Sequence, residues 1–166
     1  MKTKLDTVTK ARASALGLLA RREHSLRELT MKLRDRGCPE PVIRETLAEL
    51  VDEGMQSDDR FAEAFVRMKV HRGNGPIRIQ AELLKRGISD KIIRESLQHY
   101  ADWWKDLASE AYIKRFPDDT PDELAVLSER AKRSRFLQQR GFTPDQIRHA
   151  LEQGAKPRYF DYTHID

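Results

Sequence analysis

The stretch LLKRGISDKIIRESL (83–97) decides the fold, because the chain contains it in three versions. The other two are LRDRGCPEPVIRETL (33–47) and LQQRGFTPDQIRHAL (137–151). Relative to a central glycine, all three have leucine four residues before, arginine one before, isoleucine six after, arginine seven after and leucine ten after. Five shared positions at fixed offsets indicate a tandem repeat. The central glycines lie 50 and 54 residues apart: Gly37, Gly87 and Gly141.

The chemistry around each glycine predicts a corner between two helices. Glycine adopts positive φ without a Cβ penalty and so ends the first helix. The next residue is apolar and is expected to pack on that helix, and the one after it starts a second helix as an N-cap or a proline. These pairs are Cys38–Pro39, Ile88–Ser89 and Phe142–Thr143. We therefore expect Cys38, the single cysteine, to fill the core rather than to react.

The spacing of apolar residues predicts an all-α fold, since they recur at helical intervals and almost no strand pattern is present. One further helix before each corner would give three tandem three-helix repeats, stacked end to end in an elongated, curved molecule. The predicted boundaries are 1–54, 55–102 and 103–154, followed by a C-terminal tail, 155–166. No apolar run suits a membrane span or a secretory signal, and the lone cysteine suits a reducing compartment, so we expect a cytoplasmic protein.

Positive charge is grouped along the chain. The formal net charge is only +4 and the sequence pI is about 9.3. The segment from Arg67 to Arg94, however, contains eight basic and two acidic residues, whereas the segment from Glu40 to Glu63 contains two basic and eight acidic residues. Grouped cations are typical of proteins that bind polyanions, so the pattern indicates nucleic acid or a nucleic-acid assembly as partner.

The paired acids of SDDRFAEAF (57–65) raise the question of catalysis. Ser57 suits an N-cap, and carboxylates at 58 and 59 suit the first turn of a helix. Adjacent helical residues point about 100° apart, so the two aspartates cannot both face one metal ion or substrate. Phe61, Phe65 and Met68 follow as an expected buried stripe. We predict a helix start, no catalytic or metal-binding residue, no cofactor and no enzymatic activity.

The run DDRFAEAFVRMKVHRGNGPIRIQAELLKRGI (58–88) resembles the signature of the RecX family, regulators of the bacterial recombinase RecA. The sequence departs from that signature at Met55, where an aromatic residue is expected. The family resemblance implies three repeats of three helices and a non-enzymatic protein that binds RecA and its DNA filament and restrains RecA activities. The residues that carry the motif, with a mainly structural role expected, are Asp58, Asp59, Arg60, Phe61, Ala62, Gly75, Leu83 and Gly87.

The second repeat is the most basic, so its cations are the candidate partner-binding residues. They are Arg67, Lys69, Arg72, Arg78, Lys85 and Arg86. Direct binding to single- or double-stranded DNA stays open beside RecA binding, and we expect a monomer that does not bind membranes. The arginines next to the glycines have two possible roles, either stabilising helix ends or forming a repeated row of cations. At the second corner, Gly87→Val should cost about 1 kcal/mol or more, and Arg86→Ala should cost little.

Two other functions fit the sequence less well. A helix-turn-helix regulator would insert the second helix of one corner into the DNA major groove, and would need side chains suited to base edges. A nuclease would need clustered carboxylates or histidines, which the sequence lacks.

Overall fold

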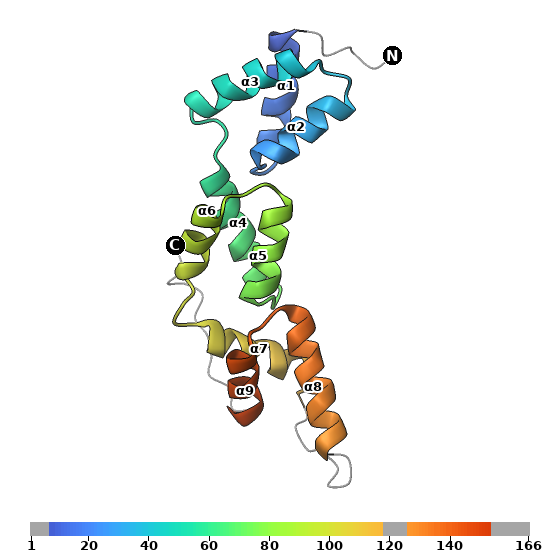
Figure 1. Ribbon diagram of the computed structural model, residues 1–166, viewed down its shortest axis with the longest axis vertical. Helices are drawn as coiled ribbons and strands as arrows, with labels where there is room; N and C mark the ends of the chain where they lie inside the picture. Colours follow the sequence, from blue (N-terminus) through green and yellow to red (C-terminus); the bar gives the residue numbers. More distant parts are fainter. Residues whose placement is uncertain (1–6, 118–125, 154–166) are drawn as a thin grey trace. The chain divides into compact units, whose positions relative to one another are not determined.

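The computed structural model describes residues 7–117 and 126–153, and every regular element in these residues is an α-helix. The predicted all-α fold is therefore confirmed (Figure 1). The predicted tail, 155–166, lies outside the described residues. The helices are α1 (Val8–Leu19), α2 (Leu26–Asp35), α3 (Glu40–Asp52), α4 (Asp58–His71), α5 (Pro76–Lys85), α6 (Asp90–Gln98), α7 (Trp104–Arg115), α8 (Val126–Arg140) and α9 (Pro144–Gln153).

The described residues form two compact units. The first contains residues 7–65 and 82–96, and the second contains 66–81, 97–117 and 126–153. Each of α4, α5 and α6 therefore has one end in each unit.

In the first unit, α1, α2 and α3 pack against one another around an aliphatic core (Figure 1). Apolar residues at helical spacing supply this core, as the periodicity predicted. Cys38 is buried in it, which confirms its predicted role as core filler, and this burial raises the pKa of its thiol. The buried residues are Ala11, Ala15, Leu29, Leu33, Cys38, Ile43, Leu47 and Leu50.

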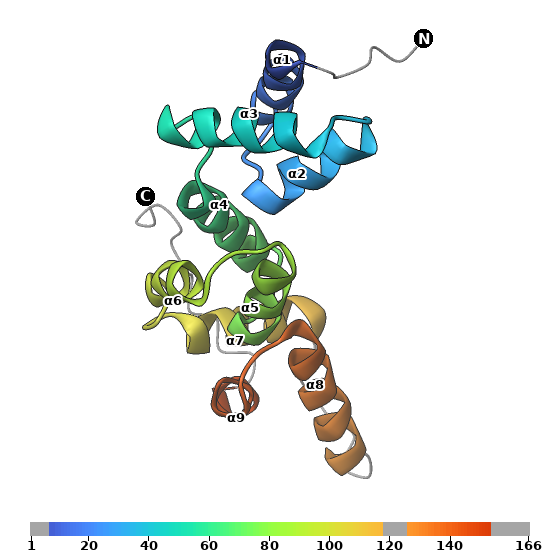
Figure 2. The same ribbon diagram turned by 45° about the horizontal axis from the view of Figure 1, so that its top comes forward.

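In the second unit, α7, α8 and α9 pack against one another around a more aromatic core (Figure 2). Trp104, Tyr112 and Phe142 are buried in it. The guanidinium group of Arg133 donates a hydrogen bond to the Tyr112 hydroxyl at 2.6 Å, so this buried arginine is satisfied at that nitrogen by an aromatic residue of α7.

The three corner glycines have φ values of +78°, +81° and +89° for Gly37, Gly87 and Gly141. At each corner, the N–H of the following apolar residue donates to the carbonyl of the repeat's leucine, five residues earlier. These bonds run from Cys38 to Leu33, from Ile88 to Leu83 and from Phe142 to Leu137. A second bond runs from each glycine N–H to the carbonyl three residues earlier, which completes a Schellman motif. The predicted corners are confirmed.

The paired aspartates begin a helix, as predicted. The N–H of Arg60 donates to the Ser57 hydroxyl at 3.2 Å, and α4 begins at Asp58. Phe61 and Phe65 are buried and stack with ring centroids 5.8 Å apart. Met68 is only half-buried, so the predicted stripe is less complete at its end.

Candidate partner interface

Asp58 caps a second helix besides beginning its own. Its Oδ1 accepts hydrogen bonds from the backbone N–H of Leu26 and from the side-chain amide of Gln56, both at 2.8 Å. Leu26 is the first residue of α2, where backbone N–H groups lack partners within the helix. The motif carboxylate therefore fixes the start of α2 to the start of α4, a contact that the sequence pattern did not indicate.

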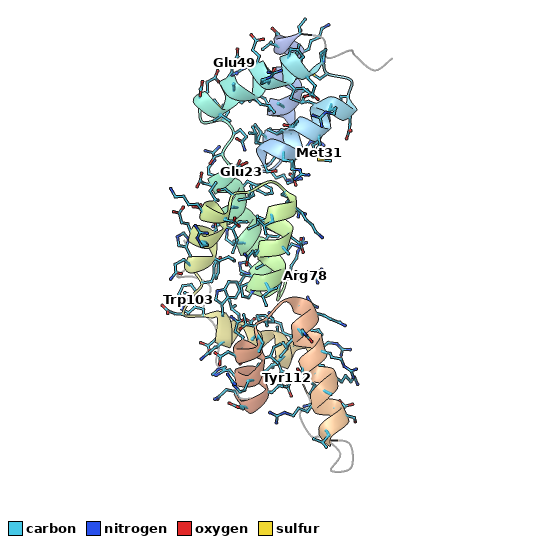
Figure 3. The ribbon with its side chains drawn as sticks, in the orientation of Figure 1. Glu23, Met31, Glu49, Arg78, Trp103 and Tyr112 are labelled. Carbon is cyan, nitrogen blue, oxygen red and sulfur yellow. The ribbon has the colours of Figure 1, made fainter. Side chains whose placement is uncertain are left out.

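Arg60 ties the turn before α4 to the segment between α1 and α2. Its Nε donates to Glu23 at 2.8 Å, and its Nη2 donates to the carbonyls of Gly54 and Met55 at 2.9 and 3.2 Å (Glu23 is labelled in Figure 3). Ala62, the small motif residue on the same helix, is fully buried. These contacts give the motif residues a role in holding the first unit together.

The start of α2 also contacts the second corner. The hydroxyl group of Ser25, which is fully buried, donates to the main-chain oxygen of Arg86 at 2.8 Å. A Cβ atom on Gly87 would lie 3.0 Å from the Arg27 side chain. The corner glycine is therefore favoured by a close neighbour as well as by its positive φ.

The start of α5 makes the corresponding contact with the third corner. The N–H of Gly75 donates to the main-chain oxygen of Arg140 at 2.8 Å, and that of Ile77 donates to the oxygen of Gly141 at 3.0 Å. A Cβ atom on Gly75 would lie within 2.4 Å of the Gly141 oxygen, which leaves no room for a larger residue. Backbone contact between two segments thus explains the motif glycine at position 75.

Four of the candidate cations belong to the second unit. Arg67, Arg72 and Arg78 are exposed, and Lys69 is half-buried. The guanidinium group of Arg78 donates to the main-chain oxygen of Gln139 at 3.3 Å (Arg78 is labelled in Figure 3). Burial raises the pKa of the Tyr100 phenol, and the nearby charge of Arg67 opposes that rise. Arg67 and Arg72 thus have side chains available to a partner, whereas Arg78 also holds the third corner.

The other two candidates belong to the first unit and differ from each other. Lys85 is exposed. Arg86 lies 3.4 Å from Glu28, 3.7 Å from Glu82 and 4.5 Å above the Phe65 ring. Its side chain is only 31% exposed, because these two acids and the aromatic ring pack against it. The expectation that Arg86→Ala costs little stability is therefore revised.

The arginines before the other two corner glycines also contact neighbouring segments. Arg36 donates to the Ser14 hydroxyl on α1. Arg140 donates to the main-chain oxygen of Arg72 at 2.9 Å, and its guanidinium lies 5.2 Å from the Phe136 ring centroid. By contrast, the arginines seven residues after the glycines are exposed: Arg44, Arg94 and Arg148. The arginine directly before each corner glycine therefore has a role in stabilising the fold.

Every helix that follows a corner begins with an acidic residue in its first turn: Glu40 in α3, Asp90 in α6 and Asp145 in α9. Hydrogen bonds from Arg148 and then Lys105 lower the pKa of Asp145, so that carboxylate is ionised at neutral pH. A recognition helix places its N-terminal residues against base edges between phosphates. Carboxylates at that position disfavour the helix-turn-helix alternative.

No described helix is both long and apolar enough to cross a membrane. In residues 7–117 and 126–153, no three histidine, cysteine, aspartate or glutamate side chains are grouped so as to hold a metal ion.

Comparison with known proteins gives a consistent result along the chain. Models of the first, second and third three-helix domains of RecX match residues 11–50, 57–97 and 105–151. The chain is 48% identical over 140 residues to the regulatory protein RecX of Chromohalobacter salexigens, covering 84% of this chain and 90% of that protein. It is 44% identical over 139 residues to the regulatory protein RecX of Halorhodospira halophila, covering 84% of both.

Solved structures agree. The crystal structure of RecX from Lactobacillus salivarius matches with a TM-score of 0.72 and 25% identity, over 88% of this chain and 95% of that one. A second crystal structure, of a regulatory protein RecX, matches in fold with a TM-score of 0.76 at 20% identity, over 89% and 73% of the two chains. With three domain models matched in order and relatives aligned over most of their length, the chain belongs to the RecX family of regulatory proteins.

Proposed function

We propose that this protein binds the recombinase RecA, as free protein or as its filament on DNA, and restrains its recombinase, ATPase and coprotease activities. Membership of a family named for regulation supports a regulator over an enzyme. We place it in the cytoplasm, where RecA and its DNA are, and we expect it to act as a monomer.

Exposed cations in the second repeat are the main support for this proposal. Arg67 lies in α4, Arg72 directly follows that helix, and Lys85 ends α5. Within the described residues, no acidic side chain forms an ion pair with these three. Exposed cations without acidic partners are available to phosphates or to an acidic protein surface. Arg86 has internal partners and is therefore less available to an external partner.

A direct test measures ATP hydrolysis by purified RecA on single-stranded DNA as this protein is added. We expect the RecA ATPase to fall with rising concentration, while the protein alone hydrolyses neither ATP nor DNA. Intrinsic turnover that survives repurification and disappears on substitution of one acidic residue would overturn the proposal, as would an unchanged RecA ATPase.

A further inference from the structure

A cavity of about 200 Å³ lies in the second unit, beside the ends of α4, α7 and α8. Gly73 and Ala111 line it, and a Cβ atom on Gly73 would lie 3.5 Å from that of Ala111. The same lining contains four permanent cations and an aromatic ring: Arg72, Lys114, Arg115, Arg140 and Phe136. We call this the third-repeat pocket.

Neutralising helix ends explains only part of this charge. Each helix C-terminus carries roughly half a negative charge, so three of them offset about one and a half positive charges. Glu110 pairs with Lys114 and offsets one more. The four cations therefore leave a surplus of about one and a half charges at the pocket, which an external anion would neutralise.

The guanidinium groups have few partners of their own. Arg115 lies 5.2 Å from the ring centroid of its neighbour, Phe116. Arg140 donates to the main-chain oxygen of Arg72 and lies over Phe136. No acidic side chain in the described part of the chain forms an ion pair with Arg72, Arg115 or Arg140. Aromatic and main-chain contacts hold the guanidinium groups of Arg115 and Arg140 in place without pairing them with an acid.

We infer that the third-repeat pocket binds the phosphodiester backbone of single-stranded nucleic acid. Pockets for whole small molecules usually measure about 300–1,000 Å³, so this smaller pocket suits one group of a longer chain. Guanidinium groups bind phosphate oxygens through paired donors. The Arg140 guanidinium lies over the half-buried Phe136 ring, and a base can stack on this guanidinium–ring pair, whereas a duplex would keep the base stacked inside its helix.

An acidic protein segment fits less well. A carboxylate and a phosphodiester each present two free oxygens and one charge, so charge alone does not separate the two ligands, but only a nucleic-acid strand also carries bases that stack on a guanidinium or an aromatic ring. A nucleic-acid site in this pocket would act without RecA and is therefore distinct from the proposed binding of RecA.

The test uses the full-length protein, a fluorescent oligothymidylate and no RecA, with anisotropy measured across a salt series. The variant Lys114→Gln with Arg115→Gln removes two pocket cations. The control Arg44→Gln with Arg94→Gln removes two exposed cations from α3 and α6, so both proteins lose the same charge. Circular dichroism checks that helicity is retained.

We expect the pocket variant to bind more weakly and its log–log salt slope to flatten by about 0.7 for each lost contact, and the control to keep the wild-type slope. Wild type should bind the single strand more tightly than a duplex of equal length. Equal effects of both variants would overturn the inference, because net charge alone would then explain binding. Equal affinity for single strand and duplex would also overturn it, as would polyglutamate competing as well as unlabelled oligothymidylate.

Discussion

The hydroxyl group of Ser25 donates a hydrogen bond to the main-chain oxygen of Arg86 at 2.8 Å, although 61 positions separate them in the sequence. The N–H of Gly75 donates to the main-chain oxygen of Arg140 at the same distance. Ser25 and Gly75 each precede the second helix of their repeat, and Arg86 and Arg140 each precede a corner glycine. The same position in two successive repeats thus binds the corner of the next repeat.

Substitution of Gly75 tests this contact. Gly75→Ala places a methyl group within 2.4 Å of the Gly141 oxygen, so the backbone must shift. Overpacking of this kind costs roughly 1–3 kcal/mol. Gly17→Ala is the control, because no atom lies within 4 Å of its added Cβ and alanine favours helix by up to about 1 kcal/mol. Thermal unfolding should show a lower Tm for the first variant and not for the second; equal Tm values would contradict the close contact.

The two motif aspartates should differ in their effect on stability. Asp58→Ala removes the acceptor for the first N–H of α2, and losing such a cap costs about 0.5–2 kcal/mol. Asp59 is exposed, so Asp59→Ala should cost only a few tenths to about 1 kcal/mol through the helix dipole. Urea unfolding of both variants measures the difference. A larger cost at position 59 would mean that Asp58 does not cap α2.

Neighbouring cations at the second corner should differ as well. Arg86→Ala loses contacts with Glu28, Glu82 and Phe65, and such pairs contribute about 0.2–1 kcal/mol each. Lys85→Ala removes an exposed side chain and should change stability by less than about 0.5 kcal/mol. Chemical denaturation compares them. If Arg86→Ala proves as mild as Lys85→Ala, these contacts do not stabilise the fold.

His24 should make the fold less stable in mild acid. The residue is 3% exposed, and burial lowers the pKa of its ring below the ordinary 6.5, although the bond from Nδ1 to the Arg22 carbonyl acts in the opposite direction. As the pH falls below about 6.5, the unfolded chain takes up a proton that the folded chain resists, so stability declines until the folded ring also titrates. Titration of His24 by NMR should give a pKa below 6.5; a higher value would reverse the expected sign.

Local features were predictable from the sequence. The corner glycines, the Ser57 cap and the burial of Cys38 each depend on a few adjacent residues whose backbone preferences are strong. Contacts between repeats were not predictable in the same way. The cap that Asp58 provides for α2 requires knowledge of which helix starts lie together in the fold. The number of basic residues in the sequence likewise could not show that Arg86 pairs with internal acids whereas Lys85 is exposed.

Binding of RecA can be tested with a variant that lacks exposed cations whose side chains contribute little to folding stability. The variant combines Arg67→Ala, Arg72→Ala and Lys85→Ala, all exposed positions. It keeps Arg78 and Arg86, because their side chains contact Gln139 or internal acids and their loss would disturb folding. Helicity should therefore match that of the wild type.

The decisive measurement is the affinity of this triple variant for the RecA–DNA filament across a salt series. The control combines Arg44→Ala, Lys91→Ala and Arg94→Ala, which removes the same charge from exposed positions of α3 and α6. We predict that the wild type and the control bind alike, whereas the triple variant binds more weakly and with a flatter salt dependence. Wild-type affinity in the triple variant at low salt, or no binding of the wild type to either the filament or free RecA, would contradict the account.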